Sequence, residues 1–338
     1  MKKTLVIHGG MHKTGSSVIQ RTLYENRELL LGHGILYPLT GLIHDPQIGH
    51  RHYGLMKALE NSAKSFDVFK QFNQEVDESG CNVIILSHED IVSPRRSIID
   101  GAKLLTEHYD VKLICYIRDP IQYFNAKYKE WVRRQEFVGE PADFVIEHLD
   151  YLDWDKLLKP WFKLLPASSV VVKKYERNSL LNQSSIDDFC EILGSHWDIN
   201  IKELLSKLPG SNNVGLSNKE TLLELMRNKY FLNQFDSEQS CSKFFDLKAK
   251  IKTEENEGLL LSKEVARQIK ARNWHARNYF QKKLSIEFSI PLLDELVFDN
   301  SFNDEELRVE YKRAIANILS ANFSLSNFLL RSRNRKNS

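Results

Sequence analysis

The stretch TLVIHGGMHKTGSS, residues 4–17, decides the fold class of this chain. It begins with a short apolar run, residues 4–8, of the kind that forms a buried parallel strand. A glycine-rich segment follows, and a helical pattern starts at Ser16. A strand, a glycine-rich loop and a helix in this order direct backbone N–H groups and the positive end of the helix toward one point. The stretch therefore predicts an anion-binding loop within an α/β fold.

The side chains of this loop add to its affinity for an anion. Gly15 lets the backbone approach a phosphate group closely, and Lys13 contributes a positive charge. In a Walker A loop the lysine follows the second glycine, and the next hydroxyl group binds Mg²⁺. Lys13 instead precedes Gly15, so the loop departs from the Walker A order. The residues predicted to bind the anion are His12, Lys13, Thr14, Gly15, Ser16 and Ser17.

Further apolar runs predict a parallel sheet around this loop. They cover residues 34–37, 82–86, 111–117 and 169–173. Helical patterns lie between these runs, which implies parallel strands joined by right-handed crossovers. We therefore predict an α/β fold with a P-loop-like parallel sheet flanked by helices and a helical C-terminal extension.

The C-terminal half carries mainly helical patterns. They fall at residues 187–193, 218–226, 262–283 and 304–322. The polar stretch 237–258 is predicted to be an excursion on the surface. We expect one domain over residues 1–300, which consists of the binding core at 4–180 and a mostly helical part at 181–300. A C-terminal helix and basic tail are expected to follow at 301–338.

Composition and charge narrow the classes of function. The chain has 338 residues, of which 42% are hydrophobic and 27% charged, as is ordinary for a globular protein. Its net charge of +2 argues against nucleic-acid binding by the whole molecule, so an anion site must be a local cluster. No apolar run is long enough for a signal peptide or a membrane span. We expect a cytoplasmic protein, and a reducing compartment also fits its scattered cysteines, which are Cys81, Cys115, Cys190 and Cys241.

A second anion-binding motif follows the apolar run at residues 111–117. Arg118 comes directly after that run, so it is expected at the carboxyl edge of the sheet, where open α/β sheets bind ligands. Pro120 restricts Asp119 to an extended conformation and suits the first turn of the next helix. The alternative role for Arg118 is an ion pair with a nearby carboxylate.

These two motifs resemble those of sulfotransferases that use 3′-phosphoadenylyl sulfate (PAPS). The order Lys-Thr-Gly-Ser-Ser at residues 13–17 is similar to their 5′-phosphosulfate loop, and Arg118-Asp119-Pro120 is similar to their 3′-phosphate motif. In that family the lysine that matches Lys13 contacts the bridging oxygen of the leaving phosphate, and no metal is needed. Weaker matches to bacterial carbohydrate sulfotransferases lie at residues 34–38, 170–176 and 273–280.

The resemblance spans residues 4–285 and implies transfer of a sulfuryl group from PAPS to a hydroxyl or amine, with a carbohydrate as the implied acceptor. The implied partners are the small-molecule donor and a glycan or glycolipid, without nucleic acid. One position departs from the family. A serine normally completes the 3′-phosphate site, and Ala126 stands in its place beside Asn125. The role of Arg118 is therefore carried over, and the role of the serine is not.

The candidates for the catalytic base come after the apolar run at 82–86. Ser87-His88 is similar to the Thr-His pair of cytosolic sulfotransferases, and Ser87-His88-Glu89 fits the Ser-x-Glu pattern of bacterial carbohydrate enzymes. Adjacent residues point to different sides, so either His88 or Glu89 is expected to act as the base. A rival cluster, which is also a weak candidate for a metal site, consists of His44, Asp45, His50 and His52.

Two other functions remain open from the sequence. The first is a P-loop kinase with a degenerate loop, which would require Mg²⁺ and an aspartate at a strand end, such as Asp90 or Asp119. The second is a non-catalytic nucleotide-binding relative, which the alanine at position 126 favours.

Overall fold

The computed structural model describes residues 2–45, 49–60, 62–92, 96–205, 216–231, 238–251, 258–284, 299 and 304–334. The chain divides into two compact units. The first comprises Met1–Tyr123, Asp150–Asn212 and Arg272–Ser289, and the second comprises Phe124–Leu149, Asn213–Ala271 and Ile290–Ser338. The domain limits expected from the sequence stay a prediction.

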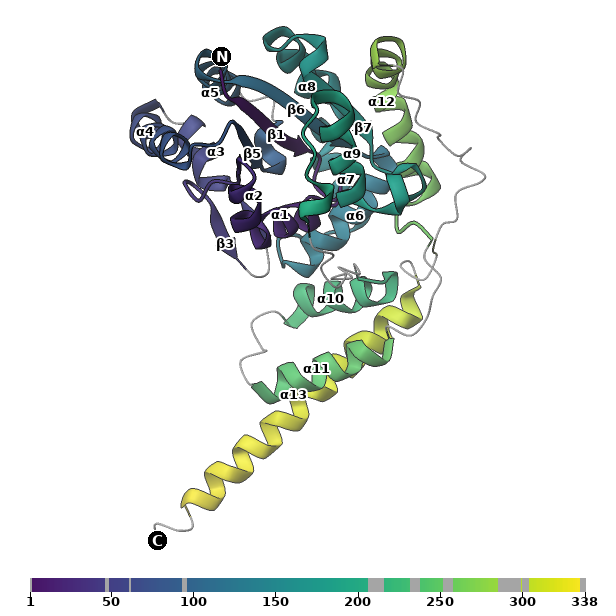
Figure 1. Cartoon of the computed structure of the whole chain (residues 1–338). Coiled ribbons are helices and arrows are strands. Elements are labelled where there is room, and N and C mark those ends of the chain that lie inside the picture. Colours follow the sequence, from purple (N-terminus) through teal and green to yellow (C-terminus); the bar gives the residue numbers. More distant parts are fainter. Residues whose placement is uncertain are drawn as a thin grey trace. The chain divides into compact units, whose positions relative to one another are not determined.

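The first unit contains a five-stranded parallel sheet with the strand order β2-β5-β1-β6-β7 (Figure 1). Each strand overlaps one of the apolar runs, so the predicted sheet is confirmed. The strands are β1 (Thr4–Gly10), β2 (Ile35–Leu36), β5 (Val83–Ser87), β6 (Asp110–Ile117) and β7 (Val170–Lys174). A separate hairpin, which the sequence patterns did not predict, consists of β3 (Ile43–Asp45) and β4 (Gly49–Arg51).

Helices alternate with these strands, as predicted. The helices before residue 120 are α1 (Ser16–Glu25), α2 (Arg27–Gly32), α3 (Tyr53–Glu60), α4 (Ser62–Ser79) and α5 (Arg96–His108). The later ones are α6 (Pro120–Arg133), α7 (Pro141–Glu147), α8 (Trp154–Leu164), α9 (Ser185–Trp197), α10 (Asn218–Phe231), α11 (Glu238–Ile251), α12 (Lys263–Leu284) and α13 (Glu305–Asn334).

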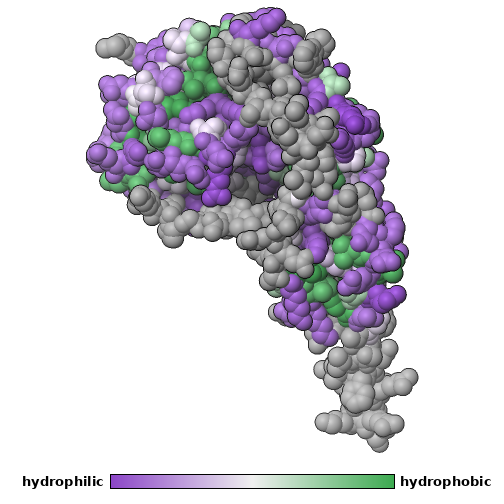
Figure 2. All heavy atoms as spheres, turned by 90° about the vertical axis from the view of Figure 1, so that its right-hand side faces the viewer, coloured by the Kyte–Doolittle hydropathy of each residue, from purple (hydrophilic) through white to green (hydrophobic). Residues whose placement is uncertain are grey.

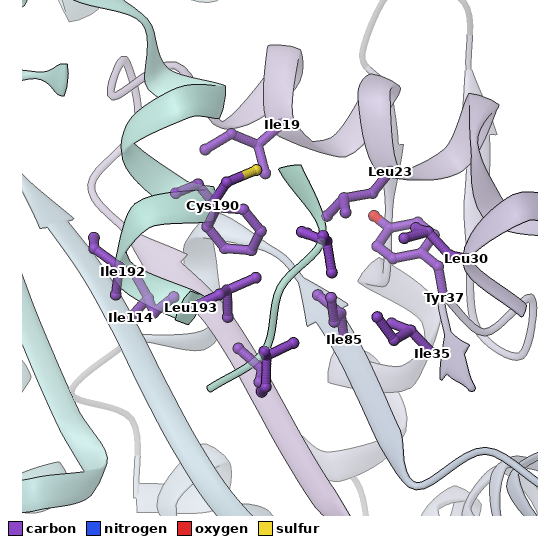
Figure 3. Packing of buried hydrophobic residues seen from close by; sticks show 14 of the residues in the cluster. Ile19, Leu23, Leu30, Ile35, Tyr37, Ile85, Ile114, Cys190, Ile192 and Leu193 are labelled. Carbon is purple, nitrogen blue, oxygen red and sulfur yellow. The ribbon is translucent and has the colours of Figure 1, made fainter. Parts of the chain in front are cut away.

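Both faces of the sheet are buried, which explains why its strands are continuous apolar runs. One face packs against α1, α2 and α9, and Figure 3 shows Ile85 and Ile114 of the sheet against Ile19 of α1. The neighbouring strand residues Ile7 and Leu86 point to the opposite face, where α3, α5 and α8 pack. Full burial of each such side chain contributes about 1.5–3 kcal/mol.

The register of the sheet sets the position of the loop. His8 of β1 lies opposite Ser87 of β5, and Gly10 lies opposite Tyr116 of β6. Because the strands are parallel, their carboxyl ends meet at one edge of the sheet. The segments that follow β1, β5 and β6 therefore start next to one another, and all three were predicted to carry functional residues.

Gly10 is required at the end of β1 for two reasons. Its φ of 137° is unfavourable for any residue with a Cβ atom, and a Cβ would lie 2.5 Å from the backbone oxygen of Tyr116. We expect Gly10→Ala to lower the free energy of unfolding by about 2–4 kcal/mol, as measured by denaturant titration. Gly32→Ala is the matched control, because a Cβ at Gly32 meets no atom within 4 Å. Equal stability of the two variants would contradict this account of the loop.

Charged contacts connect helices within the second unit. Arg308 of α13 donates two hydrogen bonds to the Glu140 carboxylate, at 2.9 and 2.7 Å, where α7 begins. Lys248 of α11 donates to Glu224 of α10 at 2.7 Å. The prediction of an excursion at residues 237–258 was wrong over most of its length, because α11 lies there. This helix buries Phe244 although its sequence is mostly polar and charged, and the composition had suggested a surface segment.

Hydrophilic residues cover much of the face shown in Figure 2. Within the described residues, no helix combines the length and the apolar character needed to cross a membrane.

Candidate functional site

The loop between β1 and α1 is built from internal hydrogen bonds. The N–H of Met11 donates to the carbonyl of Tyr116 at 2.9 Å, which ties the loop to β6. The hydroxyl of Thr14 donates to the carbonyl of Met11 at 2.6 Å, so this side chain stabilises the loop. Thr14 can therefore offer its backbone N–H, rather than its hydroxyl, to an anion. Lys13 adopts a left-handed conformation with a φ of 65°. These contacts form a tight turn immediately before α1.

Gly15 lies at the N-terminus of α1 and is also left-handed, with a φ of 75°. A Cβ atom here would lie 2.9 Å from the hydroxyl of Tyr175, so a larger residue would not fit. Among the described residues, no side chain caps the N-terminus of α1. The first turn of α1 and its half-buried Ser17 can therefore offer donors to an anion.

Arg118 contacts the same loop. Its Nη1 donates to the carbonyl of Lys13 at 3.1 Å, and its backbone N–H approaches the sulfur of Met11 at 3.5 Å. The sequence separates these two cationic residues by more than one hundred positions, and the parallel pairing of β1 with β6 brings them together. The structure thus joins the two predicted anion motifs on one edge of the sheet.

The two aspartates that a kinase would require have other partners. Asp119 caps α6, since its Oδ1 accepts hydrogen bonds from the N–H groups of Ile121 and Gln122 at 3.1 and 3.0 Å. Burial raises the pKa of the Asp119 carboxyl. Asp90 pairs with His12, at 2.9 Å between Oδ1 and Nε2. These contacts do not favour a Mg²⁺ site, and no group of three or more metal-binding side chains occurs within the part of the chain that is described.

The two α6 residues predicted near the 3′-phosphate belong to the second unit. Within that unit, Asn125 Oδ1 accepts a hydrogen bond from the N–H of Leu260 at 2.9 Å. Ala126 is half-buried. The amide oxygen of Asn125 thus supports the local backbone, and the expected roles of both residues toward a ligand stay predictions.

Glu89 lies directly beside the start of α1. It is the first residue of a short 3-10 helix, η1 (Glu89–Ile91), and its Oε1 accepts a hydrogen bond from the Ser16 hydroxyl at 2.5 Å. Burial by itself would raise the pKa of this carboxyl, but the neighbouring His12 and the hydrogen bond from the Ser16 hydroxyl outweigh it and hold the pKa below its usual value. Glu89 is therefore an ionised, buried carboxylate that can accept a proton.

His88 is placed differently, although it is adjacent in sequence. Its Nδ1 accepts a hydrogen bond from the backbone N–H of Asp90 at 2.9 Å. A backbone N–H can only donate, so the proton of the neutral ring lies on Nε2. Burial lowers the pKa of the His88 imidazole, which keeps it neutral. His88 Nε2 is thus a buried N–H donor, without a partner among the described residues. This geometry favours Glu89 over His88 as the base.

The rival histidine cluster contains one side chain with a clear structural role. His52 Nδ1 accepts from the N–H of Ser87 at 3.0 Å, and its Nε2 donates to the carbonyl of Pro38 at 2.9 Å. Burial lowers the pKa of His52 to about 4. Both ring nitrogens are occupied, so His52 positions the end of β5. His50 stacks on Tyr24 with a centroid distance of 4.0 Å. His44 and Asp45 belong to β3, and their side chains lie outside what the structure describes.

Two residues beside Glu89 or its partner Ser16 were not identified from the sequence. Arg51, the last residue of β4, has its Nη1 4.0 Å from Glu89 Oε2. Gln20 lies on the same face of α1 as Ser16, four residues later, and both its amide atoms are buried without a hydrogen-bond partner in the described part of the chain. The four-residue spacing from Ser16 could have indicated Gln20. Arg51 could not be found, because the hairpin that carries it had no recognisable pattern.

Comparisons with known proteins give little additional information. No protein-family model and no curated protein matches the chain. Among solved structures, the sulfotransferase domain from the curacin biosynthetic pathway is 13% identical, with a TM-score of 0.36, over 80% of this chain and 97% of that one. Retinol dehydratase in a complex with retinol and PAP is 11% identical, with a TM-score of 0.29, over 85% and 84% of the two chains. Likenesses at these TM-scores do not decide what the chain does, so its function has to be inferred from the residues around the loop.

Proposed function

We propose that this protein is a sulfotransferase that moves a sulfuryl group from PAPS to an acceptor hydroxyl or amine. The α1 N-terminus and Lys13 bind the 5′-phosphosulfate, and Arg118 binds the 3′-phosphate. Glu89 removes the proton of the acceptor as the acceptor attacks sulfur. Lys13 stabilises the charge that develops on the leaving phosphate, and adenosine 3′,5′-bisphosphate is the second product.

The observation that carries this proposal is the hydrogen bond from Arg118 to the carbonyl of Lys13. It supports the placement of two cationic residues at one short loop, one within the loop and one at the end of the neighbouring strand. PAPS carries two separate anionic groups on one nucleoside, which is the ligand chemistry such a pair suits. A carboxylate next to the helix N-terminus, as Glu89 provides, supplies the base that sulfuryl transfer needs.

The kinase alternative has less support. It needs a lysine after the second glycine and an aspartate directed at Mg²⁺, whereas Lys13 precedes Gly15 and Asp119 caps α6. A non-catalytic nucleotide-binding relative would not need an ionised carboxylate buried beside the loop. Glu89 therefore favours the enzyme over the binding protein.

Two finer parts of the proposal concern the acceptor and the location of the protein. A carbohydrate acceptor follows from the resemblance of the motifs to bacterial carbohydrate sulfotransferases. A cytoplasmic location is supported by Cys81, Cys115 and Cys190, which are buried free thiols.

Calorimetry with two nucleotides tests the proposed donor. We expect adenosine 3′,5′-bisphosphate to bind, with an affinity that excess EDTA leaves unchanged, because both anion motifs use protein cations. ATP lacks the 3′-phosphate that Arg118 would hold, so we expect it to bind at least about tenfold more weakly, on the scale of one charge-assisted hydrogen bond. Tighter binding of ATP that depends on Mg²⁺ would instead establish the kinase function.

A further inference from the structure

The Arg51–Glu89 pair is incomplete as an ion pair. Nη1 and Oε2 are 4.0 Å apart, which is beyond hydrogen-bonding distance. Glu89 Oε2 and Arg51 Nε are both buried and have no hydrogen-bond partner among the described residues. Leaving buried charged atoms unpaired is costly, so this arrangement is expected to be completed by a further polar group.

The geometry of the gap indicates which group would complete it. The separation of 4.0 Å between the two atoms is less than twice an ordinary hydrogen-bond distance of about 2.8 Å, so bonds from a single oxygen atom to both are compatible with it. The group must accept a hydrogen bond from the arginine and donate one to the carboxylate. A hydroxyl group does both with a single oxygen atom.

The two oxygens of Glu89 face different partners. Oε1 accepts from Ser16, the first residue of the helix whose N-terminus would bind the donor, and Oε2 faces Arg51 on the hairpin. The gap is therefore on the side of the carboxylate away from Ser16.

We propose that Arg51 is a catalytic residue that holds the acceptor oxygen between its Nη1 and Glu89 Oε2, and that this pair selects a hydroxyl acceptor over an amine. The inference rests on the proposed function and specifies its acceptor. The hydroxyl oxygen attacks sulfur, its proton passes to Glu89 Oε2, and the bond between sulfur and the bridging phosphate oxygen breaks. The electron pair of that bond leaves with adenosine 3′,5′-bisphosphate. Arg51 lowers the barrier because it stabilises the negative charge that builds up on the attacking oxygen.

Selection against amines follows from the charge of Arg51. An aliphatic amine is an ammonium ion near neutral pH, with no lone pair to accept the arginine N–H. Its positive charge would also lie close to the guanidinium in a partly buried site, where charges of the same sign repel strongly. A neutral hydroxyl meets neither obstacle.

Small nucleophiles test the proposal without knowledge of the natural acceptor. The wild-type protein is incubated with PAPS and either methanol or methylamine at equal concentration near neutral pH, and methyl sulfate and N-methylsulfamate are quantified. We expect methyl sulfate to dominate. Arg51→Gln should lower the rate of methyl sulfate formation about 10- to 100-fold, which is the effect of losing one hydrogen bond to a charged group. The ratio of methyl sulfate to N-methylsulfamate should also fall in this variant. Arg51→Lys should recover part of the rate.

Lys57→Gln is the matched control. Lys57 and Arg51 both lie over the ring of Tyr53, at 5.4 and 5.7 Å, but the side chain of Lys57 pairs with Glu60 rather than Glu89. This control should leave both product rates unchanged. Binding of adenosine 3′,5′-bisphosphate, measured by calorimetry, should be the same in all variants and shows that they are folded.

The outcomes separate the two levels of the proposal. A wild-type protein that does not bind adenosine 3′,5′-bisphosphate would refute the proposed function itself. Suppose that Arg51→Gln binds adenosine 3′,5′-bisphosphate normally. An undiminished rate of methyl sulfate formation, or an unchanged product ratio, would then refute the role of Arg51 alone. Normal binding without any consumption of PAPS by water or methanol in the wild type would refute the bridging position.

Discussion

Lys13→Ala is expected to lower the rate of sulfuryl transfer about 100- to 1000-fold, the usual effect of removing one preorganised donor to a developing anion. The ammonium group of Lys13 stabilises the leaving phosphate only as the bond to sulfur breaks, so the turnover number should fall more than the affinity for the donor. Turnover is measured as the formation of adenosine 3′,5′-bisphosphate from PAPS. The free energy of unfolding should change little, because Lys13 is only half-buried at the loop.

Lys103→Ala on α5 provides the comparison for this variant. Its side chain is 59% exposed and pairs with Asp100, so its loss should affect neither turnover nor folding. Near-normal turnover of Lys13→Ala would remove this lysine from the chemistry. It would leave the α1 N-terminus and Arg118 as the donor site.

Glu89→Gln should slow transfer about 100- to 10 000-fold, the range expected for loss of a general base. Glutamine keeps the size of the side chain and an oxygen that can accept from Ser16, but it cannot take up a proton. Binding of adenosine 3′,5′-bisphosphate should persist in this variant, so calorimetry separates loss of chemistry from loss of the site. His88→Gln should have a smaller effect, because the neutral ring offers an N–H at Nε2 rather than a lone pair.

The pH dependence gives an independent check on Glu89. The charged or titratable groups around it include His12, His88, Arg51, His8 and Tyr37, and the net result of burial and these neighbours is a pKa below the usual value. The carboxylate acts when it is ionised, so the wild-type rate should fall only when the pH drops below that lowered pKa. Two outcomes would assign the base to a histidine. One is a rate in Glu89→Gln close to that of the wild type. The other is a wild-type rate that falls through the neutral range with a pKa like that of imidazole.

The order of the strands along the chain and the place of the loop were predictable from the sequence. Apolar runs such as residues 4–8 and 111–117 are long enough and continuous enough to identify strands that are buried on both faces. The loop at residues 11–15 was equally clear, because Gly15 and Lys13 stand between a strand and a helix, where the local context defines an anion site. These features depend on neighbours within a few residues.

Other parts of the fold lacked a local signal. Helix α11 buries Phe244 but is rich in polar and charged residues, so the prediction for residues 237–258, which was made from composition, missed it. The hairpin of β3 and β4 consists of two three-residue strands, which are too short for an alternating pattern. Without that hairpin, Arg51 had no assigned place.

The sequence alone identified the anion motifs and two candidate bases. Only the tertiary structure distinguished those bases and placed Arg51 beside Glu89. His88 and Glu89 are adjacent, and from the sequence they are equally plausible as bases. In the fold, the Asp90 N–H occupies Nδ1 of His88, which leaves the ring proton on Nε2. The Ser16 hydroxyl donates to Glu89, which favours its charged form. His52 is a candidate base in the sequence and a fully bonded support in the fold. The 4.0 Å gap between Arg51 and Glu89 joins residues that are 38 positions apart. A proton's position and the use of a lone pair depend on atoms that folding brings together from distant segments, and local sequence patterns carry no information about those contacts.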